Sequence, residues 1–66
     1  MKTKYPNIEV ELVGQDGNAF NLIGIVQKAL KNGGCTKAEI DQFIKEATSG
    51  DYDNVIQTCM RWVEVS

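Results

Sequence analysis

The chain of 66 residues contains no histidine and only two cysteines, Cys35 and Cys59. Histidine is the commonest general base and the commonest metal ligand at neutral pH. Without it, a serine or cysteine nucleophile lacks its usual activator, and two widely separated cysteines do not make a zinc framework. We therefore expect no enzyme activity, no cofactor and no bound metal ion.

Long apolar segments and basic stripes are also missing. No segment approaches the roughly 20 apolar residues of a membrane-spanning helix, and the start MKTKYPNIEVELVG has no apolar run of signal-peptide length. The formal net charge is −2 and the isoelectric point is about 4.9. Nucleic-acid-binding domains usually carry a basic stripe, so we expect a protein partner and no nucleic acid. Without a membrane-spanning segment or a signal peptide, we expect a soluble cytoplasmic protein with reduced thiols that does not bind a membrane.

The length predicts one small domain that spans residues 1–66, because a chain this short can build only one small core. Its most apolar stretch is Ala19–Lys31, AFNLIGIVQKALK. Wound as a helix, its apolar side chains cover an arc roughly twice as wide as the stripe of an ordinary surface helix. The stretch therefore predicts a central helix enclosed by the other elements, with Asn18 as its N-cap and Asn32-Gly33-Gly34 at its end.

Gly24 interrupts this helix, where glycine costs about 1 kcal/mol relative to alanine. We expect a neighbouring backbone to approach closely there; the alternative is a ligand or partner that presses on the same spot.

Two further helices follow. Thr36 and Glu39 have the spacing of a capping box, and Asp51 is placed to cap the third helix. Cys59 falls on the apolar face of the third helix, where a thiol packs as a small inert hydrophobe, whereas Cys35 precedes a helix N-terminus. The predicted core is Phe20, Ile23, Val26, Leu30, Ile40, Phe43, Ile44, Val55, Ile56 and Cys59.

The segment Ile8–Val13, IEVELV, alternates with the period of a half-buried strand, after a polar lead-in of residues 1–7. A lone strand leaves backbone groups unpaired, so this strand needs a partner strand. The candidates are Val63–Val65, a second copy of the chain or a strand of another protein. The prediction is an α+β fold: a small three-helix bundle with one N-terminal strand or a two-stranded ribbon. The alternative is a hairpin of Ile8–Val13 with Ala19–Val26.

We expect a non-catalytic protein-interaction module whose surface combines the strand edge, its Asp-Gly loop and two aromatic side chains. Tyrosine and tryptophan are frequent interface anchors, although in so small a domain both can belong to the core. The candidate residues are Glu9, Glu11, Gln15, Asp16, Gly17, Tyr52 and Trp62. The alternative is a nucleic-acid-associated regulator that dimerises to gather Lys2, Lys4, Lys28 and Lys31. The protein-interaction hypothesis also allows a homodimer.

Two stretches, LVGQDGNAF at Leu12–Phe20 and ATSGDYDNVIQTCMRWVEV at Ala47–Val65, resemble short uncharacterised proteins of bacteriophages, prophages and bacterial genomes. The resemblance covers most of the chain and brings no known activity. It implies a prokaryotic or viral protein that works in the cytoplasm of the host cell. Small acidic phage proteins often modulate host proteins, and this analogy extends to the present chain.

The segment SGDYDNVIQTCMRWV also resembles the last helix of ubiquitin-associated-type bundles. Those helices begin with glycine and an acidic residue and carry an apolar residue near their end. This resemblance implies a three-helix arrangement, and a shared fold does not by itself imply ubiquitin binding.

Overall fold

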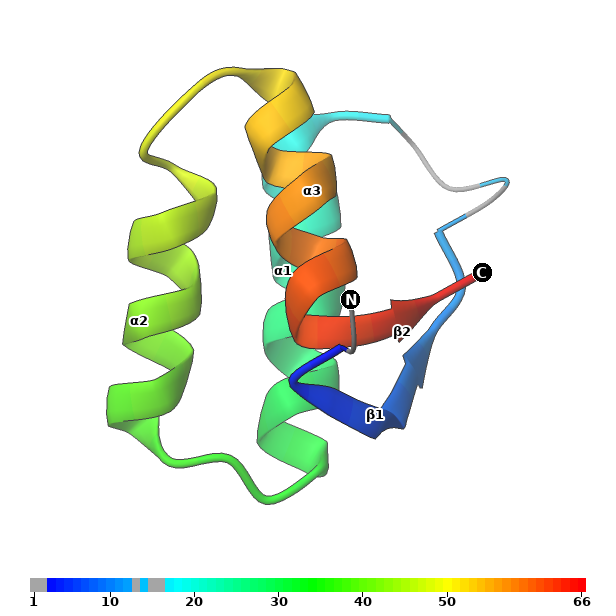
Figure 1. Cartoon of the computed structure of the whole chain (residues 1–66), viewed down its shortest axis with the longest axis vertical. Helices are drawn as coiled ribbons and strands as arrows, with labels where there is room; N and C mark the ends of the chain where they lie inside the picture. Colours follow the sequence, from blue (N-terminus) through cyan, green and yellow to red (C-terminus); the bar gives the residue numbers. More distant parts are fainter. Residues whose placement is uncertain (1–2, 13, 15–16) are drawn as a thin grey trace.

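The computed structural model describes residues 3–12, 14 and 17–66. The chain runs from one strand through three helices to a short second strand (Figure 1). The elements are β1 (Tyr5–Val10), α1 (Ala19–Asn32), α2 (Lys37–Ala47), α3 (Tyr52–Trp62) and β2 (Val63–Val65). The predicted α+β class is therefore confirmed, in its form with a two-stranded ribbon.

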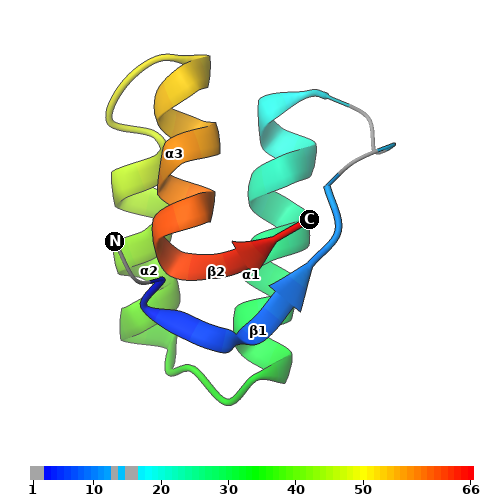
Figure 2. The ribbon, with the colours of Figure 1, turned by 45° about the vertical axis from the view of Figure 1, so that its right-hand side comes forward.

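The two strands pair in parallel, with all three helices between them along the chain (Figure 2). Val10 lies opposite Val65, and the ladder continues beyond the strands because Ser66 N donates to Val10 O at 2.9 Å and Leu12 N donates to Ser66 O at 2.9 Å. Of the three partners considered for the N-terminal strand, the structure shows Val63–Val65 of the same chain.

The predicted bounds of the first strand were wrong at both ends. The strand begins at Tyr5 and ends at Val10, so residues 5–7 belong to it. The register shifts between Tyr5 and Glu9, and Pro6, which has no N–H to donate, lies in this irregular part. The alternation of apolar and polar residues identified only the regular part of β1, where Val10 is buried and Glu9 is exposed. Val13 lies outside the described residues.

Each helix begins at the cap that the sequence predicted. Asn18 accepts a hydrogen bond from Phe20 N, Thr36 and Glu39 form a complete capping box, and Asp51 accepts from Asn54 N. These side chains satisfy backbone donors that a helix start leaves without partners. The hairpin alternative was wrong, because Ala19–Asn32 is helical.

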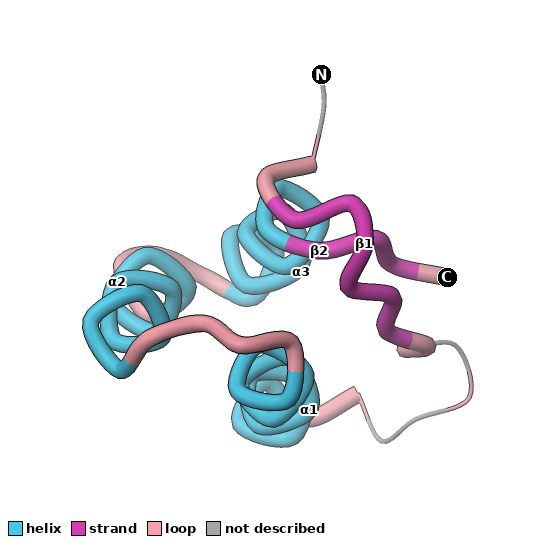
Figure 3. The backbone as a smooth tube through the Cα atoms, turned by 90° about the horizontal axis from the view of Figure 1, so that it is seen from below, coloured by secondary structure: helices cyan, strands magenta, loops and turns pink. Residues whose placement is uncertain are grey.

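Helix α1 contacts α2, α3 and β1, and α3 contacts α1, α2 and β2, so the two helices share the middle of the fold. The enclosure predicted for α1 was too wide, because its buried residues Leu22, Ile23, Val26 and Leu30 span only about 100° of the helix. In Figure 3, α2 lies on one side of the α1–α3 pair and the ribbon lies on the other side. The buried apolar residues come from all of these elements: Val10, Leu22, Ile23, Val26, Leu30, Ile40, Phe43, Ala47, Val55, Cys59, Trp62 and Val63.

The predicted core was wrong for Phe20, whose side chain is 82% exposed. At 100° per residue, Phe20 lies about 100° from the middle of the stripe formed by the buried residues of α1. Ile44 and Ile56 are only partly buried and pack against the core from its margin. The other seven residues of the predicted core are buried.

The explanation predicted for Gly24 was also wrong. A Cβ atom at Gly24 would meet nothing within 4 Å, so no neighbouring backbone approaches there. The close approach is instead at Gly33, where a Cβ would lie 2.5 Å from Ile8 Cδ1. Glycine at the C-cap of α1 thus allows β1 to pack against the end of this helix.

Across the described ranges, no helix is long and apolar enough to cross a membrane.

Candidate interaction surface

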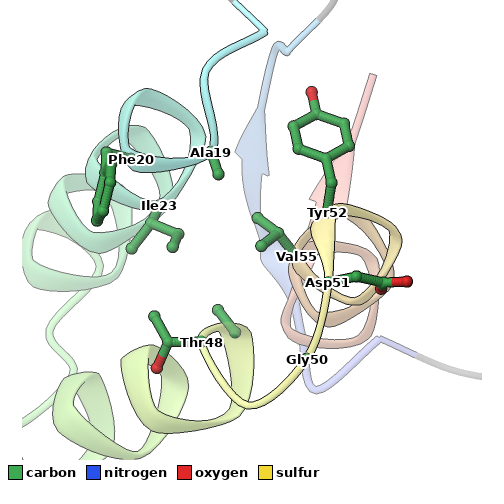
Figure 4. Close-up of a pocket in the computed structure, with 9 residues that line it drawn as sticks. Ala19, Phe20, Ile23, Thr48, Gly50, Asp51, Tyr52 and Val55 are labelled. Carbon is green, nitrogen blue, oxygen red and sulfur yellow. The ribbon is translucent and has the colours of Figure 1, made fainter.

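A groove opens at the end of the bundle where α1 begins, α2 ends and α3 begins (Figure 4). Its volume is about 260 Å³. The residues that line it are Ala19, Phe20, Ile23, Ala47, Thr48, Gly50, Asp51, Tyr52 and Val55. We call this hollow the end groove.

Two aromatic side chains on the end groove face solvent. Phe20 is 82% exposed and Tyr52 is 47% exposed; they come from the first turns of α1 and α3. Ile23, Ala47 and Val55 are buried and form the inner wall. The end groove therefore joins an apolar interior wall to an exposed aromatic rim.

Hydrogen bonds fix the corner between α2 and α3. Asn54 Nδ2 donates to Glu46 O at 2.8 Å and to Ala47 O at 3.3 Å, and Ser49 Oγ donates to Glu46 O at 2.7 Å. A Cβ at Gly50 would lie 3.0 Å from Asn54 Cβ, so a side chain at this position would press on Asn54. The shape of this wall is therefore set before any partner arrives.

The end groove is acidic where it is charged. Asp51 is the one charged side chain among the described residues that line it, and Asp53 follows in the first turn of α3. Asp51 Oδ1 accepts from Asn54 N at 3.0 Å and so also caps the helix. The exposed Asp51 carboxylate thus caps α3 and also supplies the charge at the rim of the end groove.

A second hollow of about 500 Å³ lies between the end of α1 and the start of α2. Its lining residues are Gln27, Lys31, Cys35, Lys37, Ile40 and Asp41. Lys37 Nζ lies 3.0 Å from Asp41 Oδ2 in an exposed ion pair. Long solvated side chains form most of this hollow, so polar atoms make up a larger share of its lining than of the lining of the end groove.

The structure describes five of the seven residues predicted for the interaction surface. Glu9 and Glu11 are exposed on or beside β1, and Gln15 and Asp16 lie outside the described residues. Gly17 does lie beside Tyr52, because a Cβ at Gly17 would be 3.4 Å from the Tyr52 hydroxyl.

Trp62 lies in the core and is 2% exposed, so the core alternative is correct for this residue. Its Nε1 donates to Glu46 Oε1 at 2.9 Å, and its ring meets Phe43 edge-on at a centroid distance of 5.6 Å. Lys4 Nζ lies 4.1 Å from the centroid of the Trp62 ring. Lys4 therefore covers the tryptophan as a cation–π partner.

The perturbed ionisable groups stabilise the fold. Hydrogen bonds from the Thr36 backbone and from the Tyr5 hydroxyl lower the pKa of Glu39, and the bond to Glu39 raises the pKa of Tyr5. Hydrogen bonds from Gln42 and Trp62 lower the pKa of Glu46.

Burial raises the pKa of Cys59 to about 11. Among the described residues, none of Tyr5, Glu39, Glu46 and Cys59 lines either hollow. Nor do the described segments hold any group of three or more histidine, cysteine or acidic residues that could bind a metal ion.

Sequence reasoning missed Phe20, Thr48 and Gly50 as parts of a surface. The signal available for Phe20 was its place at the edge of the apolar arc of α1. Thr48 and Gly50 carried no comparable signal, because only the packing of α2 against α3 places them beside α1.

Comparisons with known proteins give no relative for this chain: no protein-family model, no curated protein and no solved structure matches it.

Proposed function

We propose that the protein is a non-catalytic interaction module that binds a partner protein through the end groove. The observation that carries this proposal is Phe20, a large apolar side chain that is 82% exposed beside a preformed apolar wall. Exposed aromatic side chains next to a pocket are typical anchors of protein interfaces. Tyr52, on the other helix, provides a second anchor on the same rim.

The resemblance of the LVGQDGNAF and ATSGDYD motifs to phage and prophage proteins adds the biological setting. We propose that the module belongs to a phage or mobile element and modulates a protein in the cytoplasm of a bacterial host. The motif LVGQDGNAF ends at Phe20, and ATSGDYD runs from Ala47 to Asp53. Both motifs therefore contribute residues to the end groove, which supports the choice of this surface.

Affinity capture with matched variants tests the proposal. Phe20→Ala removes the exposed ring, and Met60→Ala removes another exposed apolar side chain, 55% exposed and eight positions along α3 from Tyr52. We expect the wild-type chain and Met60→Ala to retain the same bacterial proteins, identified by mass spectrometry, and Phe20→Ala to lose them at least about tenfold. Identical recovery by all three, or no protein above the bare resin, contradicts the proposal.

The strand edge remains a separate prediction. Glu9 and Glu11 are exposed there, and a two-stranded ribbon keeps an open edge on each side. If the edge takes part in binding, Glu9→Lys with Glu11→Lys weakens the same capture, and unchanged capture removes the edge from the surface.

The alternative of a dimeric nucleic-acid regulator also remains a prediction, tested by a salt-dependent mobility shift with DNA. Among the lysines named for it, Lys4 lies over the Trp62 ring and Lys2 lies outside the described residues. The protein-binding hypothesis is supported by Phe20, which is exposed beside the buried wall of the end groove.

A further inference from the structure

We infer that the end groove accepts a segment of the partner in which one apolar anchor side chain is flanked by lysine or arginine. This inference rests on the proposed function and adds the chemistry of the partner. It follows from the size of the end groove, the charge at its rim and the rigidity of its walls.

The size favours one side chain over a small molecule. The end groove measures about 260 Å³, below the roughly 300–1,000 Å³ of typical ligand pockets. Its inner wall is made by Ile23, Ala47 and Val55, which offer contact to an aromatic or branched aliphatic group. Phe20 and Tyr52 lie at opposite margins of the end groove (Figure 4), where they extend its apolar surface.

The charge at the rim favours a basic flank. Asp51 lines the end groove, and Asp53 lies in the same first turn of α3. Lys45, in the last turn of α2, is the nearest cation along the elements that form the end groove. Lys28 and Lys31 lie in the other half of α1, the nearer of them about 12 Å along the helix axis from Phe20. The lining of the end groove thus carries a carboxylate and no ammonium group among the described residues, and charge complementarity selects a cationic segment.

The helix starts at this end do not reverse that preference. Their first amides attract anions, but Phe20 N donates to Asn18 Oδ1 at 2.8 Å and Asn54 N donates to Asp51 Oδ1 at 3.0 Å. Each start thus already has a side-chain acceptor, and the start of α3 has two carboxylates.

The walls are rigid enough to define a specific site. Asn54 and Ser49 hold the end of α2 through bonds to Glu46 O and Ala47 O. Thr48, which lines the end groove, donates through Oγ1 to Ile44 O at 2.8 Å. A preformed wall reduces the ordering cost of binding, and this raises affinity for a short segment.

Selection from a random displayed-peptide library on the immobilised full chain tests the inference. We expect enriched peptides with one aromatic or branched aliphatic residue next to lysine or arginine. The consensus peptide is then synthesised, and its affinity is measured by fluorescence anisotropy in low and high salt.

Three variants test which groups bind the peptide. Phe20→Ala should weaken binding at least tenfold, and Met60→Ala should leave it unchanged. Asp51→Asn with Asp53→Asn should weaken binding about three- to tenfold and reduce its salt dependence. Asparagine at position 51 keeps the helix cap, so the double variant changes charge and not the fold.

Each other outcome has a definite meaning. Enriched acidic or uncharged peptides that lose binding with Phe20→Ala overturn the basic flank and leave the interaction module in place. Peptides that bind Phe20→Ala as tightly as wild type overturn both proposals. No enrichment overturns the short-segment inference, while the capture experiment still decides the function. A chain that forms a dimer in sedimentation, lost with Phe20→Ala, identifies a second copy as the occupant and also overturns the inference.

Discussion

At the scale of single residues, Gly24 gives the simplest test of the structure. Because a Cβ there would meet nothing within 4 Å, Gly24→Ala should gain helix propensity without any clash. We expect the free energy of unfolding to rise by about 1 kcal/mol, measured by urea denaturation. Gly33→Ala is the matched control: its Cβ would lie 2.9 Å from Ile8 Cγ1 and 3.2 Å from the backbone oxygen of Ala29, and it should destabilise the fold by about 1–3 kcal/mol. Equal effects of the two substitutions would contradict the placement of α1 against β1.

Glu39 and Glu46 predict how stability depends on pH. Hydrogen bonds lower the pKa of both carboxyl groups in the folded chain, so their contribution is fully present above the unfolded-state pKa of about 4.3. It is lost as the pH falls through the lowered folded-state values. Urea denaturation between pH 6 and pH 2.5 should therefore show declining stability below about pH 4.5. Glu39→Gln with Glu46→Gln should flatten this decline; parallel curves for the variant and the wild type would show that other groups cause it.

The residue scale also shows what a sequence can predict. The caps Asn18, Thr36 and Asp51 were predictable because a cap depends on a few adjacent residues. The exposure of Phe20 was not predictable. The apolar arc of α1 includes Phe20, but the sequence does not show which turns of the helix the other elements cover. Helix α1 is covered from α2, α3 and β1, and the first turn of α1 extends to the rim of that cover.

At the scale of elements, β2 should be necessary for the fold. Val63 is fully buried, and Ser66 bonds with both Val10 and Leu12. Full burial of Val63 contributes about 1.5–3 kcal/mol, against a total of about 3–10 kcal/mol expected for a domain of this length. Removal of Val63–Ser66 should therefore abolish cooperative thermal unfolding by circular dichroism. Val63→Ala in the full chain should be intermediate, and a truncated chain with the wild-type midpoint would contradict the pairing.

The bounds of β1 show where element-level reasoning ends. Strict alternation indicated Ile8–Val13, whereas the strand is Tyr5–Val10. Tyr5 joins the strand through contacts with distant residues: its hydroxyl donates to Glu39, and its ring lies 5.8 Å from that of Trp62. Such contacts leave no periodic pattern, so the beginning of the strand depends on tertiary structure.

At the scale of the whole molecule, Cys59 should report global unfolding. It is fully buried, and burial raises its pKa to about 11, so the folded chain holds almost no accessible thiolate at pH 8. In a Cys35→Ser variant, alkylation of Cys59 by iodoacetamide should be slowed relative to the urea-unfolded chain by the equilibrium constant of unfolding. Mass spectrometry measures both rates. Equal rates would show that α3 opens locally.

The architecture was largely predictable, and the end groove was not. The order of one strand, three helices and a short second strand followed from periodicity and caps, and Ile23 and Val26 are buried as predicted. The pairing of β1 with Val63–Val65 was one of three open choices, and its parallel direction was not predicted. The end groove combines residues of α1, α2 and α3, so it exists only after all three helices pack.

The central claim is that Phe20 serves binding and not folding, and the stability of Phe20→Ala tests it most directly. Because the side chain is 82% exposed, the free energy of unfolding in urea should stay within about 0.5 kcal/mol of the wild-type value. Phe43→Ala, in the fully buried centre of α2, provides the reference and should lose about 3–5 kcal/mol. A loss for Phe20→Ala as large as that for Phe43→Ala would place Phe20 in the core and contradict the account.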